Sequence, residues 1–289
     1  MMRALIEQAY RAACEAEIDA LKPGNVHRFA PGHGMTVEHF LESARVTAPI
    51  VADPSLSLGE RILRAVLATR EAVATNTNLG ILLLCVPLAC AAERGTSDLQ
   101  ASVAEVLSSL DMDDTRAIFG AIVAASPGGL GDAGEHDVRD EPTTGILEAM
   151  AAAADRDMIA RQYVNRFGDV FGTGLPALEA ARAAGHSGMW PTIAAFMAFL
   201  ASFEDSHILR KFGPETAARV RREAAQVNDL LARESAGTRR IEILLDFDRS
   251  LKERGLNPGT SADLTVATCF ADGLGRLGWS ASASDPHLT

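Results

Sequence analysis

An unbroken apolar segment from Ile81 to Ala92 places the strongest constraint on how this chain can fold. Together with the residues around it, it predicts a helix over 79–93 that is apolar on nearly every face, as expected of a buried helix. The segment is too short to span a bilayer, and Pro87 inside it predicts a kink or a local break. Aromatic residues make up only 5% of the chain, so the core must consist mainly of aliphatic side chains, and an Ala-rich, aromatic-poor composition favours helices over sheets.

Helical periodicity and capping signals recur along the whole chain. Ser57 with Glu60 and Ser97 with Gln100 both fit the capping box, and the short apolar stretch Ile241–Leu245 is flanked by charged helix formers rather than by turn residues. We therefore predict an all-α fold, a single bundle-like domain of about twelve helices over residues 1–279 with a polar tail at 280–289. The predicted helices cover 2–20, 37–48, 58–75, 79–93, 98–109, 113–125, 143–170, 175–184, 191–203, 214–234, 238–254 and 261–276.

Charge and cysteine content limit the partners that we expect. A net charge of −11 disfavours non-specific binding to nucleic acid or to an anionic membrane, which needs basic surface. The four cysteines form no C-x-x-C pair, which indicates free thiols in a reducing compartment, and the first residues lack a long apolar stretch. These observations predict a cytoplasmic protein with small-molecule partners; the oligomeric state stays open, a homo-oligomer included.

Two short polar turns stand out within the Ala- and Leu-rich sequence. One is Lys22–Arg28, with the sequence KPGNVHR, and the other is Asn76–Gly80, with the sequence NTNLG. The second turn opens directly into the apolar helix, and a helix N-terminus carries unpaired N–H groups and a positive partial charge that suit phosphate. The turns therefore predict a phosphorylated ligand. A further polar turn, Asn257–Asp263, also leads into a helix, where Thr260 or Ser261 could serve only as an N-cap.

Acidic groups supply the candidates for chemistry. A continuous helix over 143–170 would place Glu148, Asp155, Gln162 and Asp169 on one slowly drifting face, because they recur every seven residues. The alternative is an ordinary solvated helix face. Two carboxylates beside an anionic ligand usually require a cation, most simply Mg²⁺. The stretch from Asp205 to Gly213 offers a further carboxylate with an imidazole and two cations, or else a plain loop with helix-end charges.

Several familiar sites are missing from the sequence. It holds no HExxH or Cys/His zinc cluster, no G-x-S-x-G nucleophile motif and no Rossmann or P-loop glycine pattern. The long connection Ser126–Pro142 is predicted to be functional. It contains Glu135-His136-Asp137, and these residues leave a helical metal-dependent phosphohydrolase open as an alternative function.

Taken together, the motifs resemble one known family. The resemblance rests on Lys22-Pro23-Gly24, the Asn-Thr-Asn-x-Gly turn, the stretch Ala153–Tyr163, Asp205 with Arg210, and Asn257–Leu264. In order and spacing these resemble the triphosphoribosyl-dephospho-CoA synthase family over residues of about 20 to 270. The resemblance implies an all-α, ATP-binding transferase of cofactor biosynthesis. Its members move the triphosphoribosyl group of ATP to the ribose 2′-hydroxyl of dephospho-CoA, release adenine and use Mg²⁺.

The chain also departs from the family pattern. Members carry His-Lys after Asn-Thr where this chain has Asn78-Leu79, and they carry Asp in place of His27. These replacements resemble a branch of the family in archaea and methylotrophic bacteria that is linked to tetrahydromethanopterin-dependent one-carbon metabolism. The acceptor, and the donor as well, can therefore differ, and a noncatalytic nucleotide- or cofactor-binding protein of that metabolism stays open as another alternative.

The resemblance and the chemistry of the residues together lead to roles for individual side chains. Asp155 and Asp205 are predicted to share catalysis and metal binding, while Glu148 and His27 are further catalytic candidates. The predicted substrate- and phosphate-binding residues are Lys22, Gly24, Asn25, Arg28, Asn76, Asn78, Gly80, Arg161, Arg210, Asn257 and Ser261.

Overall fold

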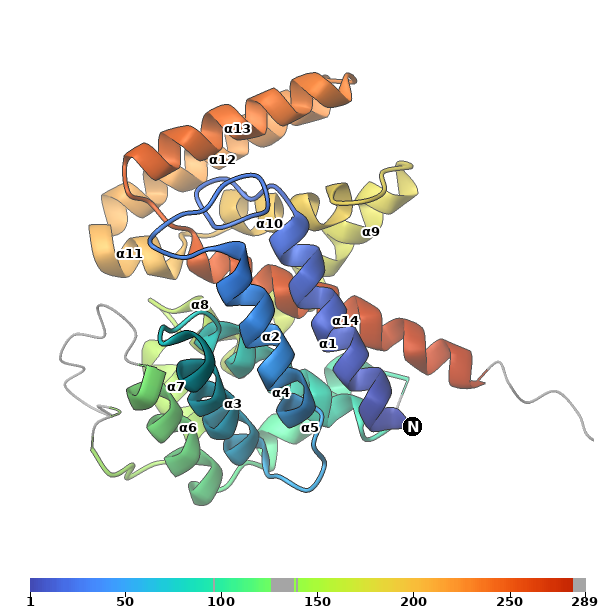
Figure 1. The fold of residues 1–289 in the computed structure, drawn as a ribbon. Coiled ribbons are helices and arrows are strands. Elements are labelled where there is room, and N and C mark those ends of the chain that lie inside the picture. Colours follow the sequence, from blue (N-terminus) through green and yellow to red (C-terminus); the bar gives the residue numbers. More distant parts are fainter. Residues whose placement is uncertain (96, 126–137, 139, 283–289) are drawn as a thin grey trace, which may run out of the picture.

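The fold consists of helices, as predicted (Figure 1), and most of the described connections are short, whereas α1 and α2 are joined by the longer segment 20–36. The computed structural model of the chain describes residues 1–95, 97–125, 138 and 140–282, with side chains up to residue 277. No strand occurs in these ranges. The helices are α1 (Met2–Asp19), α2 (Val37–Val51), α3 (Leu58–Val73), α4 (Leu79–Ala92), α5 (Leu99–Ser108), α6 (Met112–Ala125), α7 (Ile146–Ala153), α8 (Met158–Asn165), the π-helix η1 (Val170–Gly174), α9 (Leu175–Ala183), α10 (Trp190–Ser202), α11 (Ser206–Phe212), α12 (Pro214–Arg233), α13 (Gly237–Glu253) and α14 (Gly259–Ser282).

The apolar helix α4 lies at the centre of the larger of two hydrophobic cores. All but two of its residues are buried, Pro87 included, which confirms the prediction of a buried helix. The helix continues through Pro87, so the alternative of a local break there was wrong. Around it pack apolar side chains from α1, α2, α3, α5, α6 and α14. The second core lies between α10, α11, α12 and α13. Helix α14 packs against α1 and α4 on one side and against α10 and α11 on the other, so it joins the two cores.

Most helix boundaries follow local capping signals. Ser57 caps α3 and forms the predicted capping box with Glu60. At α5 the N-cap is Asp98, whose carboxylate accepts the Ala101 N–H, so the prediction of a capping box from Ser97 was off by one residue. Helix α14 is longer than predicted and continues to Ser282, into the expected polar tail. The rest of that tail and the residues Glu135-His136-Asp137 lie outside the described part of the chain.

Two predicted segments are wrong. The single helix over 143–170 is broken at residues 154–157, because Asp157 caps a new helix, α8, by accepting the N–H groups of Ile159 and Ala160. The shared face of Glu148 and Asp155 therefore does not form. The polar stretch after Asp205 is not a loop: it forms the short helix α11, with Asp205 as its N-cap.

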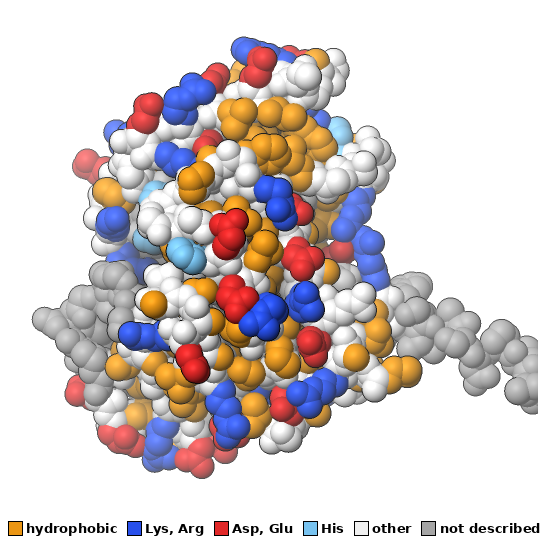
Figure 2. Space-filling view, viewed as in Figure 1, with side chains coloured by type: hydrophobic (Ala, Val, Ile, Leu, Met, Phe, Trp, Pro, Cys, Tyr) orange, Lys and Arg blue, Asp and Glu red, His pale blue; other side chains and the backbone are white. Residues whose placement is uncertain are grey.

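Acidic and basic side chains alternate on the face formed by α1 and α2 (Figure 2). Exposed pairs such as Arg45 with Glu42 and Arg3 with Asp53 account for part of this mixture. Within the described residues, no single helix is both long and apolar enough to cross a bilayer; α10 and α11 reach that length and composition only as a pair bent by 44°.

Candidate functional site

A cavity of about 870 Å³ opens where the N-termini of α4, α8, α11 and α14 approach one another. The segment before α4, the end of α1 and part of the 20–36 connection also line it, together with residues of α2, α3, α6 and α7. Much of its lining is aliphatic, with Leu79, Ile81 and Ile159 among the residues. The charged and amide-bearing lining residues are Glu17, Asn25, Arg70, Asn76, Asn78, Arg156, Asp157, His207, Arg210, Asn257 and Asp263.

The turn before α4 presents hydrogen-bond donors to this cavity. Asn76 Oδ1 accepts the Leu79 N–H at 3.1 Å, and Asn78 occupies the N-cap position without capping the helix through its side chain. The Asn78 side chain is 4% exposed, and its Nδ2 has no hydrogen-bond partner. Leaving such a donor unpaired costs about 1–3 kcal/mol. An unpaired amide beside a helix N-terminus is the feature that a bound anion would satisfy.

Three carboxyl groups line the cavity, and they differ in their partners. Glu17 pairs with Lys22 Nζ at 2.6 Å, and Asp157 uses one oxygen to cap α8 while the other faces Arg210 at 3.4 Å. Asp263, in the first turns of α14, makes no hydrogen bond or ion pair with any described residue. Burial raises its pKa well above the ordinary value, and the negative charges of Glu17, Asp205 and Asp157 raise it further.

Gly80 makes room for the Asp263 carboxyl group. A Cβ atom on Gly80 would lie 2.1 Å from Asp263 Oδ2, far inside van der Waals contact. Gly80 is predicted from sequence to bind phosphate. In the structure it lines the cavity and also allows α14 to place a carboxyl group directly against the first turn of α4.

The imidazole in the cavity belongs to His207, in the first turn of α11. Burial lowers the pKa of His207 to about 4, helped by the positive charges of Arg210 and Lys211. His207 is therefore neutral near neutral pH. Its ring also lies close to the start of α14, since a Cβ atom on Gly259 would be 2.8 Å from His207 Nδ1.

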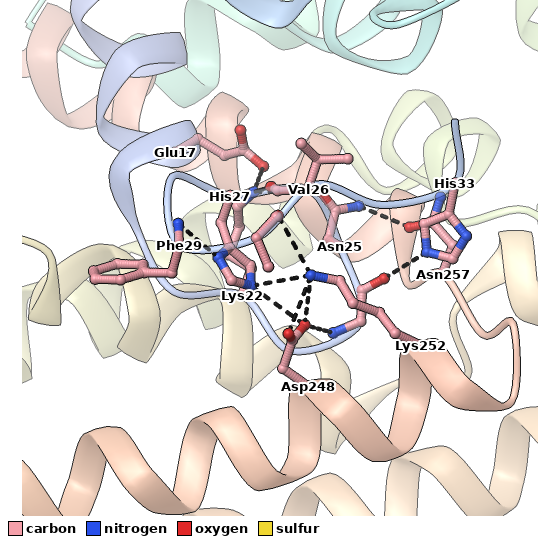
Figure 3. Close-up of polar contacts among 12 residues, drawn as sticks. Glu17, Lys22, Asn25, Val26, His27, Phe29, His33, Asp248, Lys252 and Asn257 are labelled. Atoms are coloured by element: carbon pink, nitrogen blue, oxygen red, sulfur yellow. Dashed lines mark hydrogen bonds and ion pairs between the residues drawn. The ribbon is translucent and has the colours of Figure 1, made fainter. Parts of the chain in front are cut away.

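The turn Lys22–Arg28 forms a closed network next to the cavity (Figure 3). Lys22 is fully buried, and its ammonium group contacts Glu17 at 2.6 Å, Val26 O at 2.5 Å and Asn25 Oδ1 at 3.3 Å. Burial lowers the pKa of Lys22 and raises that of Glu17, and each effect is opposed by the charge of the other group. With three acceptors around it, the ammonium group has its donors occupied by protein atoms.

The same turn is anchored to α13. Gly24, at φ +82°, donates its N–H to Asp248 Oδ1 at 2.8 Å, and His27 Nε2 lies 3.2 Å from the same oxygen. Because His27 Nδ1 accepts the Phe29 N–H, we assign the ring proton to Nε2, facing Asp248. Lys252 also contacts Asp248 at 3.0 Å. The turn thus depends on contacts with residues more than two hundred positions away in the chain.

The structure brings together only part of the predicted binding set. Asn25 and Asn257 meet at 2.8 Å on the cavity wall, where the amide of Asn25 donates to Asn257 Oδ1. The predicted residues that line the cavity are Asn25, Asn76, Asn78, Gly80, Arg210 and Asn257. Those that do not line it are Lys22, Gly24, His27, Arg28, Glu148, Asp155, Arg161, Asp205 and Ser261.

The residues outside the cavity have other partners. Arg28 pairs with Asp19 on the surface. Arg161, which lines a separate hollow together with Asp155, pairs with Asp169 at 2.9 Å. Glu148 and Asp155 are exposed, Asp155 in the turn between α7 and α8. Their catalytic and binding roles stay predictions that this geometry does not support.

The predicted metal ligands do not form a common site. Asp205 is 1% exposed and has both oxygens occupied: Oδ1 accepts the N–H groups of His207 and Ile208, and Oδ2 accepts the N–H and hydroxyl of Ser261. Asp155 is exposed in a turn. The described residues contain no group of three His, Cys, Asp or Glu side chains arranged for a metal ion. A preformed Mg²⁺ site built from Asp155 and Asp205 therefore does not fit this structure.

Sequence analysis assigned no role to several residues of the cavity wall. Asp263 belongs to a polar turn that was recognised, yet it carries no local sign that it faces the first turn of α4. Asp157 follows the predicted Asp155 by two positions. Asp157 lines the cavity and Asp155 does not, and this difference depends on the helix break that makes Asp157 the N-cap of α8. The other lining residues without an assigned role include Glu17, Arg70, Arg156 and His207.

The fold and cavity define an all-α protein whose helix N-termini converge on a polar-walled pocket of nucleotide-binding size. The model of the CitG family, described as ATP:dephospho-CoA triphosphoribosyl transferase, matches residues 3–282. The chain belongs to this family of transferases, which confirms the resemblance seen in the motifs.

Two relatives illustrate the relationship. A Pseudomonas putida protein named "Probable 2-(5''-triphosphoribosyl)-3'-dephosphocoenzyme-A synthase" is 35% identical over 111 residues, which are 38% of this chain and 39% of that protein. The chain thus aligns with about two fifths of the length of that relative. The crystal structure of a "putative triphosphoribosyl-dephospho-coA synthase" from Archaeoglobus fulgidus superposes with a TM-score of 0.64 at 24% identity, covering 80% of this chain and 96% of that one. The second likeness supports the fold.

Proposed function

We propose that this protein transfers the triphosphoribosyl group of ATP to a hydroxyl group of dephospho-CoA and releases adenine. The family match over nearly the whole chain supports this proposal. The structural observation that carries it is the cavity itself, where an unpaired amide donor at the start of α4 lies in the same wall as a carboxyl group without a partner. The reaction needs both kinds of group: donors that hold phosphate and a carboxyl group beside the sugar.

The start of α4 is the proposed phosphate-binding part of the cavity. Asn78 Nδ2 and the N–H groups of the first helical turn supply donors, and the dipole of the helix favours negative charge there. Arg210 of α11 adds a positive charge to the lining, where it is partly exposed and only loosely paired with Asp157. Lys22 acts at a distance in this proposal: it holds Glu17 and Asn25 in place from behind the wall.

The bond between ribose and adenine breaks through a cationic, oxocarbenium-like sugar. Carboxyl groups of the cavity stabilise that charge, and the aliphatic part of the lining limits the access of water, which would otherwise hydrolyse the sugar. We propose that Mg²⁺, whose use is implied by the family, enters with the triphosphate.

The proposal is tested by incubating the purified protein with ATP and dephospho-CoA and separating the products by chromatography and mass spectrometry. We expect adenine and triphosphoribosyl-dephospho-CoA in equal amounts. Release of inorganic phosphate without adenine would instead support the phosphohydrolase. Thermal stabilisation by ATP without any product, with pterin-pathway intermediates included as acceptors, would support a binding protein.

A variant of Asn78 tests where the phosphate binds. Asn78→Ala removes a buried donor that has no partner in the protein, so we expect stability equal to or above that of the wild type but ATP binding weakened by about tenfold, the lower end of a hydrogen bond to a charged group. Calorimetric titration measures the affinity. Asn228→Ala, at a residue of α12 that bonds to Met197 O outside the cavity, is the matched control and should bind ATP like the wild type.

A further inference from the structure

The three carboxyl groups of the cavity are not equivalent, and the difference singles out Asp263. Glu17 is held in a buried ion pair at 2.6 Å, and Asp157 is divided between the α8 cap and Arg210. Asp205, behind the wall, accepts four hydrogen bonds from α11 and from Ser261. Asp263 alone among them lines the cavity with no hydrogen bond or ion pair to a described residue. Its carboxyl group is therefore free to exchange a proton with a ligand.

The surroundings of Asp263 favour its neutral form. Glu17 of α1, Asp205 at the start of α11 and Asp157 at the start of α8 add negative charge around it, and the positive charge of Arg210 opposes them. Burial is the largest cause of its raised pKa, and these carboxylates add to it. A carboxyl group in such a place is protonated at a pH where an ordinary aspartate is ionised, so it can act as a proton donor.

We propose that Asp263 is the catalytic acid that protonates adenine as it leaves the ribose. The inference rests on the proposed function and deepens it by naming the proton donor. As the bond between C1′ of the ribose and N9 of adenine breaks, its electron pair stays on the purine, and the purine takes the proton of Asp263. The acceptor oxygen then forms its bond to C1′, and the hydroxyl proton passes to solvent water, from which Asp263 is protonated again.

The other groups of the wall are poorly suited to this step. His207 has a pKa of about 4, so it carries no acidic proton near neutral pH. Glu17 is held by the ammonium group of Lys22, and Asp157 by two N–H groups and Arg210, so neither carboxyl group is free to turn towards a leaving base. Gly80 is consistent with a function for Asp263, since any larger residue there would collide with the carboxyl group at 2.1 Å.

The decisive variant is Asp263→Asn, which keeps the shape of the neutral side chain but cannot donate the proton. We expect adenine formation from ATP to fall by about 100-fold or more, the usual contribution of general acid catalysis. ATP affinity and the melting temperature should stay near those of the wild type. Asp246→Asn, an identical change at an exposed residue of α13 outside the cavity, should leave the rate unchanged.

A donor with an altered base distinguishes an acid from a merely structural residue. In N7-methyladenosine triphosphate the base already carries a positive charge and leaves without taking up a proton. Asp263→Asn should therefore process this donor within about tenfold of the wild-type rate, because the acid is no longer needed. In the wild type with ATP, kcat should fall as the pH rises and Asp263 ionises, and this decline should be absent from the variant.

The outcomes separate the two proposals. If the wild type forms no adenine from any donor, the proposed function fails and the role of Asp263 fails with it. If the wild type is active and Asp263→Asn is equally active with ATP, only the assignment of Asp263 is overturned. Equal losses with ATP and with the methylated donor would show that Asp263 positions the substrate and does not protonate the base.

Discussion

Two polar turns that look alike in the sequence have opposite states in the structure. In the Lys22–Arg28 turn, the buried groups are bonded to one another and to α13, and only Asn25 reaches the cavity. The Asn76–Gly80 turn lines the cavity and keeps a buried amide nitrogen without a partner. The closed turn stabilises the wall, and the open turn has the free donors that a ligand needs. The candidate site is therefore identified by polar groups that lack a hydrogen-bond partner, and not by the presence of polar residues alone.

The largest expected effect comes from breaking the closed turn. Lys22→Met leaves Glu17 buried without its partner at 2.6 Å, so we expect the free energy of unfolding to fall by about 3–5 kcal/mol. Chemical denaturation measures this loss. The double variant with Glu17→Gln should recover part of it, because no unpaired buried charge remains.

The exposed pair of Arg45 with Glu42 provides the control. Arg45→Met should cost less than about 1 kcal/mol, as usual for surface ion pairs. A Lys22 variant of normal stability that loses ATP affinity would contradict our comparison and would return Lys22 to the phosphate-binding set that the sequence predicts.

A smaller effect is expected from Gly80→Ala in the open turn. The new methyl group would meet Asp263 Oδ2 at 2.1 Å, so α14 or the carboxyl group must shift, at a cost of about 1–3 kcal/mol in unfolding free energy. Adenine formation should fall as well. Gly120→Ala in α6 is the matched control: the nearest side-chain atom would be 3.7 Å away, and the helix should gain about 0.5–1 kcal/mol. Equal changes in unfolding free energy for the two variants would contradict the close approach of Asp263 to Gly80.

The smallest effect concerns pH. The pKa of His207 is lowered to about 4 in the folded protein, while an unfolded chain has a histidine pKa of about 6.5. Between these values the unfolded state binds more protons, so stability should decrease as the pH falls from about 6.5 towards 4. By pH 5 the contribution should be about 1 kcal/mol, after allowance for the partial exposure of the ring. Chemical denaturation of the wild type and of His207→Gln at several pH values measures this contribution. If the unfolding free energies of the two proteins change with pH in the same way, His207 does not contribute to the pH dependence.

Much of the fold could be predicted because its signals are local. The burial of α4 follows from a segment without polar residues, and the start of α3 follows from Ser57 with Glu60. The break between α7 and α8 was missed because an Ala-rich segment looks like one continuous helix. Only the capping by Asp157 reveals that the helix restarts. In the sequence, an aspartate within a helical pattern cannot be distinguished from one on a helix surface.

The candidate site was harder to predict than the fold. The amides of Asn76 and Asn78 were found because they precede an apolar helix, and their places on the cavity wall agree with that prediction. Asp205 attracted a catalytic role because it is acidic and stands among polar residues, yet its oxygens are occupied by backbone and hydroxyl donors. Asp263 received no role at all, since its neighbours in space come from four other helices or their caps.

The order of residues by itself determined the helices, the buried position of α4 and the presence of polar turns beside it, because these depend on side chains within a few positions of one another. The tertiary structure alone decided which polar groups are paired and which are open to a ligand. Lys22 and Asp263 show the reason: the first meets acceptors that occupy its donors, and the second meets a glycine and other carboxylates, so burial raises its pKa. Those neighbours are brought together by folding and are not encoded next to either residue.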